Sequence, residues 1–126
     1  MVDSWVFVDG ALPASADTVT EALRARIAEG ALESVLESSA GRTLFVVSNT
    51  ERALVMLLDR PGDPGEHATD PRADSADWSD GYVLANGQED EYPDAETVPL
   101  AEALRIVRHI LTTGRPPSDA SWTIDR

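Results

Sequence analysis

The sequence predicts an α+β fold in which an antiparallel sheet of about five to six strands packs against two main helices. Three observations favour this fold class. Short apolar runs joined by turn signals predict strands and hairpins, two stretches repeat apolar residues at helical spacing, and the elements follow in the order strand, helix, hairpin, hairpin, helix, strand. The 126 residues suit one domain, so we expect a single domain over 1–126 with a long acidic loop at about 59–80.

The first strand is expected at residues 5–8, where Trp-Val-Phe-Val is a short, apolar and β-prone run. Asp9-Gly10 supplies a turn signal directly after this run. Residues 11–17 are rich in Pro, Ser, Ala and Asp, which indicates a connection between the strand and the next element.

A helical stretch is expected at residues 18–38. Thr18 and Glu21 have the spacing of a capping box, in which two side chains satisfy free N–H groups at a helix start. Apolar residues then recur at helical spacing at positions 19, 23, 27, 31, 32, 35 and 36. Gly30 weakens the middle of this pattern. The sequence leaves two alternatives open, one helix across 18–38 or two helices broken near Gly30.

Two hairpins are expected in the middle of the chain. The apolar runs 43–47 and 53–58 are joined by a short polar link, which is typical of an antiparallel hairpin. These runs are nearly continuous in apolar residues, so we expect both of their faces to be covered at least in part. The second hairpin spans 81–92 around Asn86-Gly87, the preferred pair for a two-residue turn.

Residues 59–80, between the hairpins, hold three prolines, many acids and few apolar residues. This composition predicts a long or locally disordered loop, with order returning at Gly81. The second strand of the second hairpin is heavily acidic, which is typical of an exposed sheet edge.

The C-terminal part predicts a helix and a short strand. Pro99 stands at a first-turn position, and apolar residues from 100 to 111 form one helical face. Gly114 is suited to the position after the helix, and Pro116-Pro117 cannot continue it. Residues 121–124 are expected to form a last strand.

Composition excludes several partners and locations. The formal net charge of −13 argues against direct binding to nucleic acid or to an anionic membrane, and it favours a partner with a basic surface. No apolar run approaches the ~20 residues that cross a bilayer. The N-terminus lacks the layout of a signal peptide, so we expect a cytoplasmic protein, at least at synthesis. The oligomeric state is left open.

The residues that catalysis or metal binding would require are scarce. The chain has no Cys and no Lys, and it contains neither a phosphate-binding loop nor a Gly-x-Ser-x-Gly motif. His67 and His109 are the two histidines, and neither has a His or an acid four residues later to form a metal pair. We therefore expect no catalytic residue, no metal site and no cofactor.

The negative charge is concentrated in one third of the chain. Residues 59–96 contain 12 of the 23 acids but only 2 of the 10 basic residues. Two interpretations carry equal weight: a solvated acidic loop that keeps the protein soluble, and a negative face that binds a basic protein. On the second interpretation the predicted contact residues are Glu89, Asp90, Glu91, Asp94, Glu96, Trp78, Asp80 and Tyr92.

The C-terminal third resembles a known family. The residues that carry the resemblance are the run from Gly81 to Gly87, Tyr92-Pro93, Val98-Pro99 opening a helix that contains Ala103, Gly114-Arg115-Pro116-Pro117, and Trp122. Together they are similar to the immunity family numbered one (Imm-one) of bacterial polymorphic toxin systems, over about residues 81–126. One departure is Ile110, at a position where the family often has an aromatic residue.

The resemblance implies a protein without catalytic activity that binds and neutralises a cognate toxin, in many cases a deaminase acting on nucleic acid or nucleotides. Such a toxin would present a basic groove, which an acidic protein could cover. Gly81, Gly87, Pro99, Gly114, Pro116 and Trp122 would then be structural. Two alternatives remain: a non-inhibitory acidic binding module or effector chaperone, and a small-molecule or catalytic domain with a pocket around His109.

Overall fold

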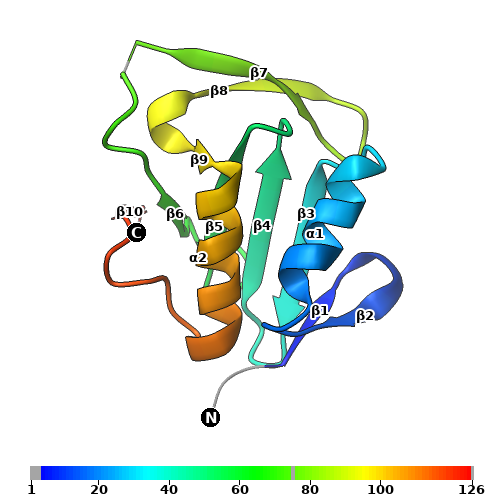
Figure 1. Ribbon diagram of the computed structural model, residues 1–126. Coiled ribbons are helices and arrows are strands. Elements are labelled where there is room, and N and C mark those ends of the chain that lie inside the picture. The colour runs from blue at the N-terminus through cyan, green and yellow to red at the C-terminus, as the bar shows by residue number, and fades with distance from the viewer. Residues whose placement is uncertain (1–3, 75, 126) are drawn as a thin grey trace.

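The computed structural model describes residues 4–74 and 76–125, and it has the predicted α+β fold (Figure 1). Its main sheet is antiparallel and has eight strands, more than the five to six expected, in the order β10-β6-β5-β4-β3-β1-β2 with β9 paired to β5. These strands are β1 (Trp5–Phe7), β2 (Leu12–Ala14), β3 (Glu33–Ser38), β4 (Thr43–Ser48), β5 (Arg52–Leu58), β6 (Glu66–Ala68), β9 (Val98–Pro99) and β10 (Trp122–Ile124).

Two helices and a separate hairpin complete the fold. The helices are α1 (Val19–Ala28) and α2 (Leu100–Thr113), and the hairpin is a two-stranded sheet of β7 (Trp78–Val83) and β8 (Glu89–Pro93). Short 3-10 turns, η1 (Asp9–Ala11) and η2 (Asp94–Glu96), come after β1 and β8. Neither described helix has the length and apolar content needed to cross a bilayer.

The main core lies between the sheet and the helices, which cover the same face of the sheet in Figure 1. On β5, Ala53, Val55 and Leu57 are fully buried in this core. Residues between them, such as Leu54 and Met56, are only partly buried. Side chains alternate along a strand, so one face of the sheet packs against the helices and the other remains partly exposed. The expected covering is therefore complete on the helix face of these strands and only partial on the other face.

The second half of the predicted helical stretch is a strand. α1 ends at Ala28, and Gly30 comes after it with φ of 90°, a left-handed conformation that glycine adopts without strain. Residues 33–38 then form β3, which pairs with both β1 and β4. Ser34 and Leu36 both point toward the core, as alternate residues of a strand do. Apolar residues at 32, 35 and 36 are compatible with a helix or a strand, and pairing with the neighbouring strands decides in favour of the strand.

Three further expectations need correction. Thr18 precedes α1, but its side chain makes no capping hydrogen bond and instead contacts the Ser15 hydroxyl at 3.0 Å. The expected connection 11–17 contains β2, which pairs with β1. The expected loop 59–80 contains β6 at residues 66–68 and the first residues of β7, so the second hairpin begins at Trp78 rather than Gly81.

The turn of the second hairpin has three residues rather than the two expected. The Leu84 N–H donates to the Gln88 carbonyl oxygen at 2.8 Å, so Ala85, Asn86 and Gly87 lie between the paired residues. Gly87 has φ of 88°, and Asn86 is not among the residues with positive φ. A type I turn and then one left-handed glycine make the usual three-residue hairpin connection. Only Gly87 therefore has a positive φ, whereas a two-residue turn would require one at both Asn86 and Gly87.

The C-terminal predictions are confirmed except for Pro99, which ends β9 and is the N-cap of α2 rather than a residue of its first turn. α2 begins at Leu100 after Pro99, and Gly114 succeeds it in the left-handed conformation with φ of 82°. The N–H of Gly114 donates to the Ile110 carbonyl oxygen, as expected for a glycine directly after a helix. The predicted last strand is β10, which pairs with β6 at one edge of the sheet. Ile110 is fully buried in the core.

Candidate functional site

The hairpin β7–β8 crosses the sheet near the C-terminal end of β4 (Figure 1). Its inner side carries Tyr82, which is fully buried, with its ring centroid 4.7 Å from that of Tyr92. Val47 of β4 points away from the main core and is also buried. The two tyrosines thus fasten the hairpin to the sheet, and the outer side of the hairpin faces solvent.

Four of the predicted contact residues line one pocket of the hairpin, and Glu89 and Glu91 are the exposed residues of its acidic strand. A shallow pocket of about 340 Å³ is lined by Gly81 and the acids Asp80, Glu89, Asp90 and Glu91; we call it the acidic hollow. A register shift between Ser79 and Tyr82 brings Asp80 and Gly81 opposite the acidic strand. Glu89 and Glu91 are exposed, and no hydrogen bond or ion pair holds their side chains within the described chain. Their charges are therefore available to a partner.

The other predicted contact residues differ in availability. Trp78, at the start of β7, is 59% exposed. Tyr92 is partly buried and donates to the Asp90 carboxylate at 2.9 Å. Burial and the neighbouring Asp90 raise the pKa of Tyr92 to about 12, so its hydroxyl remains a proton donor at neutral pH.

Asp94 and Glu96 bind other side chains of the molecule and do not line the acidic hollow. Asp94 accepts a hydrogen bond from the Ser79 hydroxyl at 2.5 Å and lies 3.8 Å from Nε of Arg52. Glu96 binds the imidazole of His67. The structure thus brings Asp80, Glu89, Asp90 and Glu91 together, and it uses Asp94 and Glu96 to position the segment after the hairpin.

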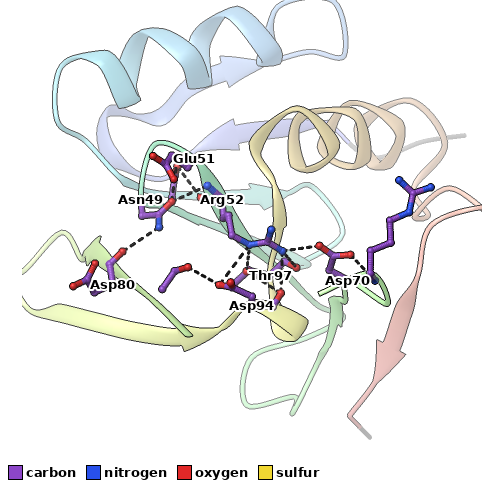
Figure 2. Close-up of polar contacts among 10 residues, drawn as sticks. Asn49, Glu51, Arg52, Asp70, Asp80, Asp94 and Thr97 are labelled. Atoms are coloured by element: carbon purple, nitrogen blue, oxygen red, sulfur yellow. Dashed lines mark hydrogen bonds and ion pairs between the residues drawn. The ribbon is translucent and has the colours of Figure 1, made fainter. Parts of the chain in front are cut away.

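The turn between β4 and β5 holds the hairpin in place (Figure 2). The Asn49 side chain donates through Nδ2 to the Asp80 carbonyl oxygen at 3.0 Å, while its Oδ1 accepts from the N–H groups of Glu51 and Arg52. At the other end of the hairpin, the Ala85 N–H donates to Glu33 of β3 at 3.0 Å. The backbone of the hairpin is therefore attached to the β4–β5 turn and to β3 of the main sheet.

Arg52 is the centre of a partly buried polar network, drawn in Figure 2. Its guanidinium donates to the Asp70 carboxylate at 2.7 Å, the Asp94 carbonyl at 2.9 Å, and both the hydroxyl and carbonyl of Thr97 at 3.0 Å. Burial alone would raise the pKa of Asp70, but the hydrogen bond and charge of Arg52 outweigh it and lower that pKa. One guanidinium thus joins β5, the segment after β6 and the turn after β8.

Both histidines have structural partners. His67 lies between two carboxylates, with Nδ1 2.8 Å from Asp125 and Nε2 in contact with Glu96. Burial lowers the pKa of His67, but the two carboxylates together raise it above its usual value. Nδ1 of His109 lies 2.8 Å from the Arg115 carbonyl oxygen, so this histidine donates to the turn after α2.

The C-terminal motif residues line a second hollow, of about 760 Å³, between the end of α2 and β10. Arg42 donates to the Gly114 carbonyl oxygen at 2.6 Å and also pairs with Asp59. The Trp122 indole N–H donates to Glu66 at 2.8 Å. These polar groups are satisfied within the molecule, which agrees with a structural role for the motif.

Sequence reasoning missed the residues that support the hairpin, namely Asn49, Arg52 and Glu33. Asn49 carried a turn signal but nothing that tied it to residue 80, which is 31 positions away. Arg52 offered a faint signal, since a single cation begins an apolar run in a strongly acidic chain. Which acids it would bind depends on the strand order, which a single sequence does not supply.

Comparison with known proteins points to one family. The family model described as Immunity protein Imm1 matches residues 11–123. This match extends well beyond the C-terminal third that carries the resemblance in the sequence. It includes both helices, the acidic hairpin and the strands of the main sheet except β1 and the last residue of β10. No curated protein matches the chain.

Proposed function

Because the chain belongs to the Imm1 family of immunity proteins, we propose that it binds a cognate bacterial toxin and neutralises it, with the acidic outer side of β7–β8 against a basic toxin surface. The observation that carries the proposal is the acidic hollow, which four acidic residues line on a hairpin that is hydrogen-bonded to the main sheet and its β4–β5 turn. A fixed group of like charges attracts a basic partner at long range and aligns it before contact.

The toxin class that fits best is one that acts on nucleic acid or nucleotides, such as a deaminase. Such an enzyme needs a basic groove to hold phosphate groups, and the acids of the hollow would compete for that groove without any chemistry of their own. Inhibition is then steric and electrostatic, and the inhibitor needs neither catalytic residues nor a cofactor. The substrate of such a toxin lies in the cytoplasm, where the immunity protein would act.

The test compares two variants with the same change in charge. Glu89→Gln/Glu91→Gln removes two charges beside the hollow, whereas Glu21→Gln/Glu29→Gln removes two exposed charges from α1 and the residue after it. The probe is the purified cognate toxin domain, identified by co-expression of this chain with candidate toxins and a survival readout. At low salt we expect the hairpin variant to associate about fivefold more slowly, with a shallower salt dependence, because steering charges act chiefly on the association rate.

The α1 variant should change the association rate far less, although both variants have the same net charge. Equal effects of the two variants would remove the hairpin from the interface. Toxin activity in the purified complex separates inhibition from chaperoning: a complex that retains full activity would indicate a non-inhibitory binding module and would contradict the proposed neutralisation. Survival of cells that express both proteins is the matching readout in vivo.

A further inference from the structure

The second face of the main sheet carries a continuous apolar stripe. Strand register places Val35, Phe45 and Met56 side by side on β3, β4 and β5, all on the side away from the helices. Val6, Leu54 and Leu58 lie on the same side in the adjoining rows. All six side chains are partly exposed, so the stripe spans several neighbouring strands; we call these six residues the sheet stripe.

The hairpin covers only one end of this face. Val47 is buried where β7 passes over β4, and Glu33, directly opposite Val47 in the register, accepts from Ala85 of the hairpin. Phe45 and Met56 lie two residues further from that end and remain partly exposed. The sheet stripe therefore begins where the hairpin ends, which makes it continuous with the surface that carries the acidic hollow.

The charged groups around the sheet stripe carry a net negative charge, because each cation there is paired with two carboxylates. Glu37 lies beside Val6 in the register, and the row of Phe45 ends at His67, which is held between Glu96 and Asp125. The one arginine that the described residues place on this face, Arg52, is already bound to Asp70 and Asp94. An apolar centre with an acidic rim complements a partner surface with an apolar centre and a basic rim. It repels a second copy of this chain, whose rim and net charge are both negative.

We infer that the sheet stripe is a second contact surface for the same basic toxin, so that the interface spans the acidic hollow and the open face of the sheet. This inference rests on the proposed function. Charged groups mainly raise association rates, whereas slow dissociation requires well-packed apolar contacts from which water is excluded. The hairpin offers one large exposed apolar side chain, Trp78. The sheet stripe supplies six partly exposed apolar side chains on an adjoining surface.

The inference predicts a kinetic separation between the two contact surfaces. Phe45→Thr/Met56→Thr removes two neighbouring apolar side chains while keeping residues that favour strands. With the same cognate toxin domain, we expect at least about a tenfold faster dissociation and less than about a twofold change in association rate. Leu12→Thr is the matched control, because Leu12 is 57% exposed on the edge strand β2, and it should leave both rates unchanged. Thermal melting verifies that the variants are folded.

A measurement on the unaltered protein provides a test that does not depend on variants folding. The Met56 thioether is partly exposed in the free chain, so we expect the toxin to slow its oxidation by dilute peroxide at least about threefold in the complex. Unchanged oxidation together with unchanged dissociation of the Phe45→Thr/Met56→Thr variant would overturn the inference while leaving the proposed function in place. Failure of the unaltered chain to bind the toxin would instead overturn the proposed function.

The same samples test the remaining occupant. If the free chain forms a concentration-dependent dimer that Phe45→Thr/Met56→Thr dissociates and Leu12→Thr does not, the stripe is an interface between copies, and the assignment to the toxin is wrong. A monomer at all concentrations in sedimentation experiments, together with the kinetic separation above, supports the assignment.

Discussion

His67 requires a proton to satisfy both of its neighbours. A neutral imidazole has one N–H donor and one acceptor nitrogen, so it can donate to only one carboxylate. In this chain both ring nitrogens contact carboxylates, those of Glu96 and Asp125, and only the imidazolium donates to both. His67 therefore joins β6, η2 and the residue after β10 through a charge that exists only when the ring is protonated.

This arrangement sets the direction of a pH dependence. The pKa of His67 is raised in the folded chain, so its contribution to stability is fully present below the unfolded-state pKa of about 6.5 and is lost as the pH rises through the raised value. We expect His67→Gln to lower the free energy of unfolding at pH 6 by about 1 kcal/mol and to have a much smaller effect at pH 8.5. Urea unfolding at several pH values measures this difference.

His109→Gln is the control for that experiment, because His109 lies beside a carbonyl oxygen and a hydroxyl rather than between carboxylates. The difference in stability between His67→Gln and the unaltered chain should shrink with rising pH. A constant difference for His67→Gln between pH 6 and pH 8.5 would mean that the ring is not protonated in the folded chain.

Arg52 shows why single residues are the hardest scale to predict from sequence. Its partners at residues 70, 94 and 97 come from segments that are 18, 42 and 45 positions away. Local spacing brings none of them together, and the contacts exist only because β9 pairs with β5. Charge counts identify the acids as one segment, but the distinction between those that bind Arg52 and those that face solvent requires the strand order.

At the scale of elements, prediction succeeded where the apolar spacing and the residues at the two ends of an element indicated the same structure. α2 has a long apolar face, a proline before it and a glycine after it, and it lies where the sequence places it. The prediction for β3 failed because positions 32, 35 and 36 suit a helix as well as a strand, and Gly30 marks the end of α1 without specifying the type of the next element. β2, β6 and β9 have two or three residues each and are too short to carry a periodic signal.

The hairpin turn offers a prediction at this scale. Gly87 has φ of 88°, and a Cβ added there would meet nothing within 4 Å, so the cost of a side chain comes from the backbone conformation alone. We expect Gly87→Ala to lower the free energy of unfolding by about 1 kcal/mol. Gly87→Asn should cost less, because asparagine tolerates the left-handed region. Chemical denaturation of both variants measures the effect, and equal losses would show that this conformation does not limit the turn.

At the scale of the whole molecule, excess negative charge opposes compaction. The chain has a formal net charge of −13, and the described ion pairs neutralise only part of it. Salt screens the repulsion between exposed charges at a distance more than it weakens partly buried pairs such as Arg52 with Asp70. We therefore expect the free energy of unfolding to rise between about 10 and 150 mM sodium chloride, as measured by thermal or urea denaturation.

The outcome that would contradict this expectation is a loss of stability over the same salt range, which would show that local ion pairs outweigh the general repulsion. Glu21→Gln/Glu29→Gln serves as the comparison, since it removes two charges from an exposed helix region. This variant should show a weaker rise in stability with salt than the unaltered chain.

The family and the fold class could be predicted because both depend on patterns that a single chain displays: strand and helix periods, turn residues, and a C-terminal motif. The acidic hollow could be predicted only in part, because charge counts identify the segment but not its geometry. A register shift in the hairpin places Asp80 beside Glu89 and Glu91. Glu96 does not line the hollow and pairs with His67 of another strand. Both depend on pairings between distant residues.

The position of α2 in the chain constrains when the protein can protect a cell that is making it. Six of the eighteen buried core residues that the structure describes come from α2, which is synthesised after every strand of the sheet except β10. A ribosome that has reached β9 has released strands whose apolar face still lacks one of its two helices. On the proposed function, this chain can bind the toxin only once α2 has left the ribosome and packed. A cell that starts to make the toxin and this chain together therefore needs this chain translated first or in excess.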